Sequence, residues 1–263
     1  MTAQASISAL QLGLPAVAPQ LRDEYSLSLA ATGALLAAST VGIIATLLAW
    51  GALADRIGER AVIGIGLTGA ALAMVAASRA GSAEALGACL VAAGAFGSSA
   101  NAASGRAVVA WFDASQRGFA LGLRHMSTPL GGALAAVSLP FIADRGGVGD
   151  ALLALAGALL VGAVAGAIGL RRAEPVAPSG AAAAHRDEPP PPPGPLRDPV
   201  IWRLSLGTAA VVLAQLSVLS FLALYLHEER GWSVGAAALA LGTVQIGGGA
   251  SRVAAGILSL IHI

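Results

Sequence analysis

The sequence predicts an all-α membrane protein, a polytopic bundle of transmembrane helices, on three observations. Of its 263 residues, 56% are hydrophobic and only 11% charged, and the mean hydropathy is +0.78, whereas soluble chains carry about 25% charged residues. Apolar stretches of roughly the 20 residues that cross a hydrocarbon core recur along the chain. Charged residues gather in the short connectors between these stretches. A soluble globular domain is therefore excluded.

We predict eight membrane spans, at residues 1–20, 29–50, 61–78, 84–105, 118–142, 150–170, 201–226 and 235–258. The connectors are short except for residues 171–200, which hold several charges and the run Pro189 to Pro193. That composition is typical of a solvated linker with a stiff polyproline stretch. It divides an N-terminal bundle of six helices, residues 1–170, from two helices at residues 201–259.

The distribution of arginine predicts the orientation. Every basic residue other than histidine is arginine, and nine lie in the connectors of one face: Arg56, Arg60, Arg106, Arg117, Arg171, Arg172, Arg186, Arg197 and Arg203. The opposite connectors hold four, Arg22, Arg79, Arg145 and Arg230. By the positive-inside rule the N-terminus and the central linker are cytoplasmic. The predicted location is a bacterial inner membrane.

Several classes of function lack their signatures. The sequence has no basic run for nucleic acid, no cluster with metal-ligand spacing, no Gly-x-Ser-x-Gly elbow and no phosphate-binding loop. We therefore predict no enzyme, no catalytic residue, no metal and no cofactor. The single cysteine, Cys89, excludes a disulfide framework.

The most informative segment is Gly51-Ala-Leu-Ala-Asp55-Arg56-Ile-Gly58-Glu59-Arg60. Its acids and bases do not belong in hydrocarbon, so they mark a tight turn at one membrane face. The pattern Gly-x-Leu-Ala-Asp-Arg-x-Gly-x-Arg resembles the loop between the second and third helices of the major facilitator superfamily of transporters. That resemblance implies two six-helix halves that rock about a site at the bilayer midplane.

The same resemblance implies a cytoplasmic gate in which Asp55 pairs with a basic residue or a helix end. Arg106 is the candidate partner. Gly51 and Gly58 would permit close helix approach and the tight turn. The alternatives are a plain topogenic loop with surface charges and, for Arg106, a snorkelling arginine. Arg252, in a pattern resembling Gly-x-x-x-Arg-x-x-x-Gly, is the expected counterpart of the gate in the second half.

An internal repeat supports two related halves. Shifting the chain by 205 residues aligns Glu24 with Glu229 and Ser28 with Ser233. From this alignment we expect the given sequence to be a fragment. Its first helix would begin before Met1, residues 260–263 would not be native, and helices nine to twelve would be missing.

Polar residues are unevenly distributed among the spans. The first, fourth and fifth spans carry most of them, whereas the third and sixth carry almost none. Because polar groups in hydrocarbon are costly unless they face a cavity or a partner, the third and sixth helices should face lipid. The amides predicted to line an interior are Asn101, Gln11, Gln215 and Gln245, and interhelical hydrogen bonding is the alternative for each.

The fifth span holds the candidates for substrate and proton. Arg124 would bind an anionic group, unless it only reaches water at the cytoplasmic end, and His125 would titrate near neutral pH. Pro129, Gly131 and Gly132 form a predicted hinge or packing site that resembles the Gly-Pro-x-x-Gly-Gly element of antiporters. In that element this chain has Thr128 in place of the first glycine, and its glycine pair comes one residue early.

The function predicted from these features is secondary active transport of a small solute, an organic anion or similar metabolite, with a proton as candidate co-substrate. The expected partners are this solute and the lipid bilayer, the protein being monomeric. The alternatives are an efflux antiporter for drugs or other solutes, a membrane sensor that does not transport, and an inert fragment.

Overall fold

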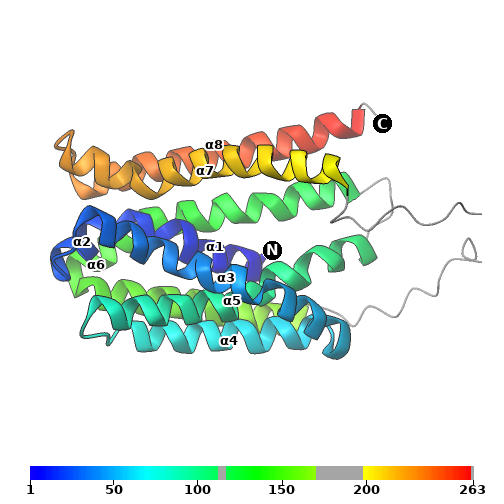
Figure 1. Cartoon of the computed structure of the whole chain (residues 1–263), viewed down its shortest axis with the longest axis horizontal. Helices are drawn as coiled ribbons and strands as arrows, with labels where there is room; N and C mark the ends of the chain where they lie inside the picture. The colour runs from blue at the N-terminus through cyan, green and yellow to red at the C-terminus, as the bar shows by residue number, and fades with distance from the viewer. Residues whose placement is uncertain (112–116, 170–197, 262–263) are drawn as a thin grey trace, which may run out of the picture.

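The computed structural model describes residues 1–111, 117–169 and 198–261, and for residues 104–111, 117–121, 253 and 255–261 it describes the backbone alone. The described chain is helical, as predicted, and contains no strand (Figure 1). Its elements are α1 (Thr2–Gly13), the 3-10 turn η1 (Leu14–Val17), α2 (Ala18–Glu24), α3 (Leu29–Ile57), α4 (Glu59–Ala77), α5 (Ala83–Trp111), α6 (Arg117–Gly169), α7 (Pro199–Glu228) and α8 (Val234–Ile261).

The predicted spans correspond to these elements with two differences. The first span is interrupted: α1 ends at Gly13, and η1 and α2 carry Pro15 and Pro19 near their starts. The fifth and sixth spans both fall in α6, which is broken at Gly147 by a φ of 83° and a ψ of 172°. Six helices of the described chain are long and apolar enough to cross a membrane, and α6 alone is long enough to cross twice.

The charged corner between the second and third spans is shorter than predicted. α3 continues to Ile57 and α4 begins at Glu59, so that Gly58 alone, with a φ of 85°, reverses the chain. The helix continues past residue 50, the predicted end of the membrane span, because a helix satisfies its own backbone hydrogen bonds and can extend beyond the hydrocarbon wherever its side chains reach water. Asp55 and Arg56 are exposed in the last turn of α3.

Small residues let neighbouring helices approach closely in the α1–α6 bundle. A Cβ atom on Gly42 of α3 would collide with the carbonyl oxygen of Val91 in α5, and one on Gly94 of α5 would collide with that of Ser39. The two helices therefore cross with their backbones nearly touching, as small-residue packing in membranes requires. The break at Gly147 divides α6 into a first arm, before this residue, and a second arm, after it. The core of the bundle includes buried side chains of α1, α4, α5 and both arms of α6, such as Ile7, Leu67, Leu90 and Leu155.

The third and sixth spans, which the sequence predicts to face lipid, expose large apolar side chains. Ile65 and Leu72 of α4 are 54% and 65% exposed, and Val161 and Ile168 in the second arm of α6 are 64% and 74% exposed. α3 has an apolar outer face as well, with Leu48 exposed. These surfaces suit a hydrocarbon environment.

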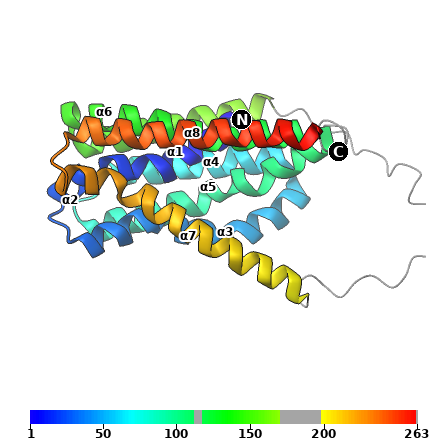
Figure 2. The ribbon, with the colours of Figure 1, turned by 90° about the horizontal axis from the view of Figure 1, so that it is seen from above.

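The last two helices differ in how they meet the bundle. α8 packs along the first arm of α6, where Gly242 faces Val137 and Gly249 faces Pro129. α7 is exposed at every residue from Ile201 to Val218 and is buried only at Leu219, Ala223 and Leu224. Figure 2 shows α7 leaving the bundle as it runs back toward its first residue. α8 therefore follows the bundle along α6, whereas α7 meets it only near the α7–α8 corner and diverges from α8 toward the opposite end.

Candidate functional site

The charged corner presents its side chains to solvent. Asp55 and Arg56 on α3 and Arg60 in the first turn of α4 are exposed. Gly58 makes the predicted tight turn, and the close helix approach predicted at Gly51 stays a prediction. The side chain of Arg106 lies outside the described residues. The Asp55–Arg106 gate therefore stays a prediction.

Amides of α1 and α5 join inside the bundle. The Nε2 of Gln4 donates a hydrogen bond of 2.8 Å to the Oδ1 of Asn101, and Gln4 is buried. Asn101 thus makes the interhelical bond that was the alternative to lining a cavity. Gln11 on α1 is half-buried, and Gln215 is exposed on the outlying part of α7, away from the other amides.

A polar junction between α3 and α5 was missed by the sequence reasoning. The carbonyl oxygen of Ala95 accepts hydrogen bonds from Thr46 Oγ1 at 2.8 Å, Trp50 Nε1 at 2.6 Å and Ser98 Oγ at 2.9 Å. Thr46 and Trp50 lie one turn apart on α3, and this spacing is the feature of the sequence from which the junction could have been predicted. The junction fixes α3 to α5 a short distance from the charged corner.

Three basic residues lie near one another between α6 and α8. Arg124 is half-buried and His125 exposed on the first arm of α6, and Arg252 on α8 is half-buried. The positive charges of Arg124 and Arg252 both act on the imidazole of His125. Arg252, the expected counterpart of the gate in the second half, thus also lies near the two residues proposed for substrate and proton. The cluster forms a positive region that an anion would enter favourably.

The predicted hinge lies where α6 contacts both α1 and α8. A Cβ on Gly131 would collide with the carbonyl oxygen of Ala5, and a Cβ on Gly132 would lie 2.6 Å from Gln245 Nε2 and 2.8 Å from the Cβ of Leu12. Pro129 is buried beside Gly249. Inside the described part of α6 the non-helical dihedral angles are those of Gly147, and the backbone is helical at Pro129, Gly131 and Gly132. In this conformation the three predicted hinge residues therefore form a packing site.

Two buried polar atoms beside this packing site have no hydrogen-bond partner among the described residues. Gln245 is 4% exposed and its Nε2 is unpaired, and Ser8, one turn before Leu12, is 1% exposed with an unpaired Oγ. An unsatisfied buried donor costs about 1–3 kcal/mol. Both atoms lie near the middle of their spans, where a polar ligand or water would satisfy them.

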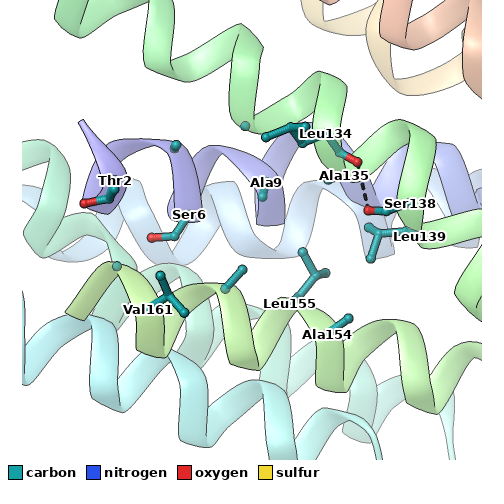
Figure 3. Close-up of a pocket in the computed structure, with 14 residues that line it drawn as sticks. Thr2, Ser6, Ala9, Leu134, Ala135, Ser138, Leu139, Ala154, Leu155 and Val161 are labelled. Atoms are coloured by element: carbon teal, nitrogen blue, oxygen red, sulfur yellow. Dashed lines mark hydrogen bonds between the residues drawn. The ribbon is translucent and has the colours of Figure 1, made fainter. Parts of the chain in front are cut away.

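A separate pocket of about 320 Å³ lies between α1 and the two arms of α6 (Figure 3). Two of its hydroxyl groups are satisfied by their own helices, since Ser138 Oγ donates to the Leu134 carbonyl at 2.8 Å and Ser6 Oγ to the Ala3 carbonyl at 3.0 Å. Of the predicted site residues only Gly131 lines it. Its apolar lining offers little to a polar solute.

At the end of the bundle with few arginines, α2 and α7 are joined by an ion pair. The guanidinium of Arg22 contacts the carboxylate of Glu228, and both side chains are about one-third exposed. Beneath this pair, an apolar cluster joins η1 and α6 to α7 and α8; it consists of Ala16, Ala136, Leu219, Ala223, Ala237, Ala238 and Leu241. The pair was missed by the sequence reasoning, although the 205-residue shift aligns Asp23 with Glu228 and so relates the two corners.

These features define a polytopic helical membrane protein in which α7 and α8 pack against the bundle of α1 to α6. Comparison with known proteins names the class. The family model for the Major Facilitator Superfamily matches residues 2–261, and the chain belongs to that superfamily.

Curated relatives and solved structures agree with this assignment. Two sequences from Mycobacterium tuberculosis strains, both described as an uncharacterized MFS-type transporter, are 32% identical over 244 residues, which is 93% of this chain and 54% of each relative. The chain thus spans about half the length of the curated relatives it matches. A bacterial homolog of the human lysosomal transporter Spinster shares the fold in two inward-facing structures.

The occupied form of that homolog has a TM-score of 0.72 at 18% identity, over 93% of this chain and 57% of the homolog. The unoccupied form has a TM-score of 0.71 at 18% identity, over 93% and 58%.

Proposed function

We propose that this protein is a secondary active transporter that carries a small solute across the membrane by alternating access. Membership of the superfamily and the description of the curated relatives support the class. The structural observation that carries the proposal is the seam between α6 and α8, which is closed by glycine contacts and holds unpaired polar atoms at mid-span. Transporters of this kind bind substrate near the midplane between their halves.

The proposed substrate is a small organic anion. Arg124 and Arg252 supply positive charge from the two sides of the seam, and His125 lies within reach of both charges. A guanidinium within a membrane span is costly, and that cost is tolerated where the group faces a cavity or a charged ligand. Because an anion would relieve the repulsion among these bases, its entry is favoured over that of a cation. His125 is the candidate carrier of a co-transported proton.

The charged corner is proposed as the cytoplasmic gate. In this proposal Asp55 and Arg106 separate and rejoin as the pathway opens and closes on the side rich in arginine. The one-residue turn at Gly58 supports the proposal, because it ties the end of α3 directly to the start of α4 and so transmits a movement of either helix. The gate would act in a monomer.

Uptake into proteoliposomes tests the substrate class. The full-length gene product is reconstituted and assayed with a panel of labelled organic anions and cations, with and without a proton gradient. Hydrogen bonds to charged groups contribute about 1.5–3 kcal/mol, so Arg124→Gln should lower uptake of the preferred anion by about 10- to 100-fold. The matched control is Arg145→Gln: this arginine belongs to the same arm of α6 but stacks on Phe141 just before the break at Gly147, at the arginine-poor end. Equal uptake by Arg124→Gln and wild type would refute the assignment.

Cysteine labelling tests the proposed orientation in an inner membrane. In a Cys89→Ser background, Ile57→Cys and His185→Cys should both react with a membrane-impermeant maleimide only from the cytoplasmic side. Labelling of the two positions from opposite sides would contradict the proposed topology and the gate with it.

A further inference from the structure

The last two helices meet the bundle of α1 to α6 differently: α8 packs along α6, whereas α7 contacts the bundle only near the α7–α8 corner. At the arginine-poor end, which holds the α2–α3 and α7–α8 corners, Leu219 and Ala223 of α7 are buried against η1 and α6. Toward its first residue, α7 is exposed on every side up to Val218. Figure 2 shows the same divergence. If the arginine-rich end is cytoplasmic, as proposed, this arrangement is closed to the outside.

We propose that Arg22 and Glu228 form a latch between the two halves of the transporter, made when the arginine-poor end is closed and broken when it opens. The inference rests on the proposed function, because a latch has a role only in a protein whose two halves move apart. Its geometry is independent of that function, since Arg22 belongs to the six-helix bundle and Glu228 is the last residue of α7. The two residues are 206 positions apart, and their contact lies at the rim of the closed seam.

Arg22 is held in place by its own corner. Its Nε donates to the carbonyl oxygen of Leu27 at 3.1 Å, and the backbone N–H of Leu27 donates to the carbonyl oxygen of Arg22 at 2.9 Å. This small ring leaves the Nη1 of Arg22 directed at Glu228. A guanidinium fixed in this way loses less conformational entropy when it pairs than a free one.

The corner that carries Glu228 is also held by internal bonds. The N–H of Glu229 donates to the carbonyl oxygen of Tyr225 at 3.0 Å, and the N–H of Trp232 donates to that of Leu226 at 3.0 Å. Arg230 Nε donates to the hydroxyl of Tyr225 at 2.9 Å. Because both partners are attached to rigid corners, the Arg22–Glu228 distance follows the separation of the two halves and not the motion of a loop.

The apolar cluster beneath the pair is an interface that can separate when the latch breaks. Alanines predominate in it, at Ala16, Ala136, Ala223, Ala237 and Ala238, so the helices pack closely with few interlocking side chains. Such an interface separates without a large rearrangement of rotamers. A partly exposed ion pair contributes little free energy, so the latch biases the closed state and does not lock it. We expect its loss to shift the ratio of closed to open molecules by about two- to fivefold.

Distance measurements between spin labels test the latch without any substrate. Labels are attached to cysteines replacing Glu24 and Glu229, in the full-length protein with Cys89→Ser, in nanodiscs. Arg22→Glu and Glu228→Arg should each raise the long-distance population about two- to fivefold, and the double swap Arg22→Glu with Glu228→Arg should restore the wild-type distribution. The neutral variants Arg22→Gln and Glu228→Gln should raise the long-distance population by a smaller factor. They replace the charge reversals in the experiment if a charge-reversal variant fails to fold.

Arg230→Glu is the matched control, because Arg230 lies at the same end but bonds within its own corner. Unchanged distances in the single variants, or the same shift in the control, would overturn the latch. Failure of the proposed function is distinguishable. A protein that shows the restored double swap but carries no solute retains the latch and loses the transport assignment, whereas uptake with unchanged distances refutes the latch alone.

Discussion

Replacement of Gly132 by alanine tests how closely α6 packs against α1 beside Gln245 of α8. The new Cβ would lie 2.6 Å from Gln245 Nε2 and 2.8 Å from the Cβ of Leu12. The amide is the far end of a flexible side chain and can move away, but the Cβ of Leu12 moves only with the backbone of α1. Overpacking of this kind costs about 1–3 kcal/mol. Alanine in place of glycine favours a helix by about 1 kcal/mol, which offsets part of that cost.

The matched control for this substitution is Gly157→Ala in the other arm of the same helix. Gly157 is exposed, and no described atom lies within 4 Å of its hypothetical Cβ. The control therefore receives the gain in helix propensity without the collision. Thermal unfolding of the purified full-length protein in detergent should show Gly132→Ala less stable than Gly157→Ala by about 1–3 kcal/mol. If Gly132→Ala is as stable as the control, α6 is not packed against Leu12 of α1 as the structure has it.

Three other substitutions test particular features of the bundle. Trp50→Phe removes the hydrogen bond to the Ala95 carbonyl and should lower stability by about 0.5–1.5 kcal/mol in the same unfolding assay; an unchanged midpoint would contradict the junction. Gly58→Ala forces a side chain into a φ of 85° and a ψ of 155° and should cost about 1–3 kcal/mol, whereas Gly64→Ala, with open space around it, should cost nothing. Gln245→Met removes an unpaired buried amide, so the protein should keep or gain stability while uptake falls; loss of stability would indicate a hydrogen bond at that amide.

The parts of the fold that followed from the sequence are those set by local composition. The length of an apolar run decides whether a helix crosses the bilayer, and the glycine in Ile57-Gly58-Glu59 decides where the chain reverses, because few other residues adopt that backbone conformation. The lack of polar side chains in α4 likewise predicted a surface toward lipid. Each of these features is decided within about one helix length.

The contacts that make the candidate sites depend on helix packing, and the sequence carried little information about them. Gln4 and Asn101 are 97 residues apart, and Arg22 and Glu228 are 206 apart. Either pair forms only because the intervening helices pack in one particular order. The position of Arg252 beside His125 has the same origin, since it requires α8 to lie along the first arm of α6.

Glycine content is the clearest example of what composition leaves undecided. The 34 glycines predicted closely packed helices, but Gly42 and Gly94 face carbonyl oxygens of a neighbouring helix, while Gly157 and Gly207 face open space among the described residues. Nothing in the local sequence separates the two groups. In the proposed transport cycle the distinction also depends on conformation: Gly249 of α8, which faces Pro129 of α6, is in contact only while the two helices are together at its level. Two packings that differ by a few kcal/mol are the basis of alternating access. The closed end held by Arg22 and Glu228 therefore belongs to one of the two packings, and the seam glycines must tolerate both.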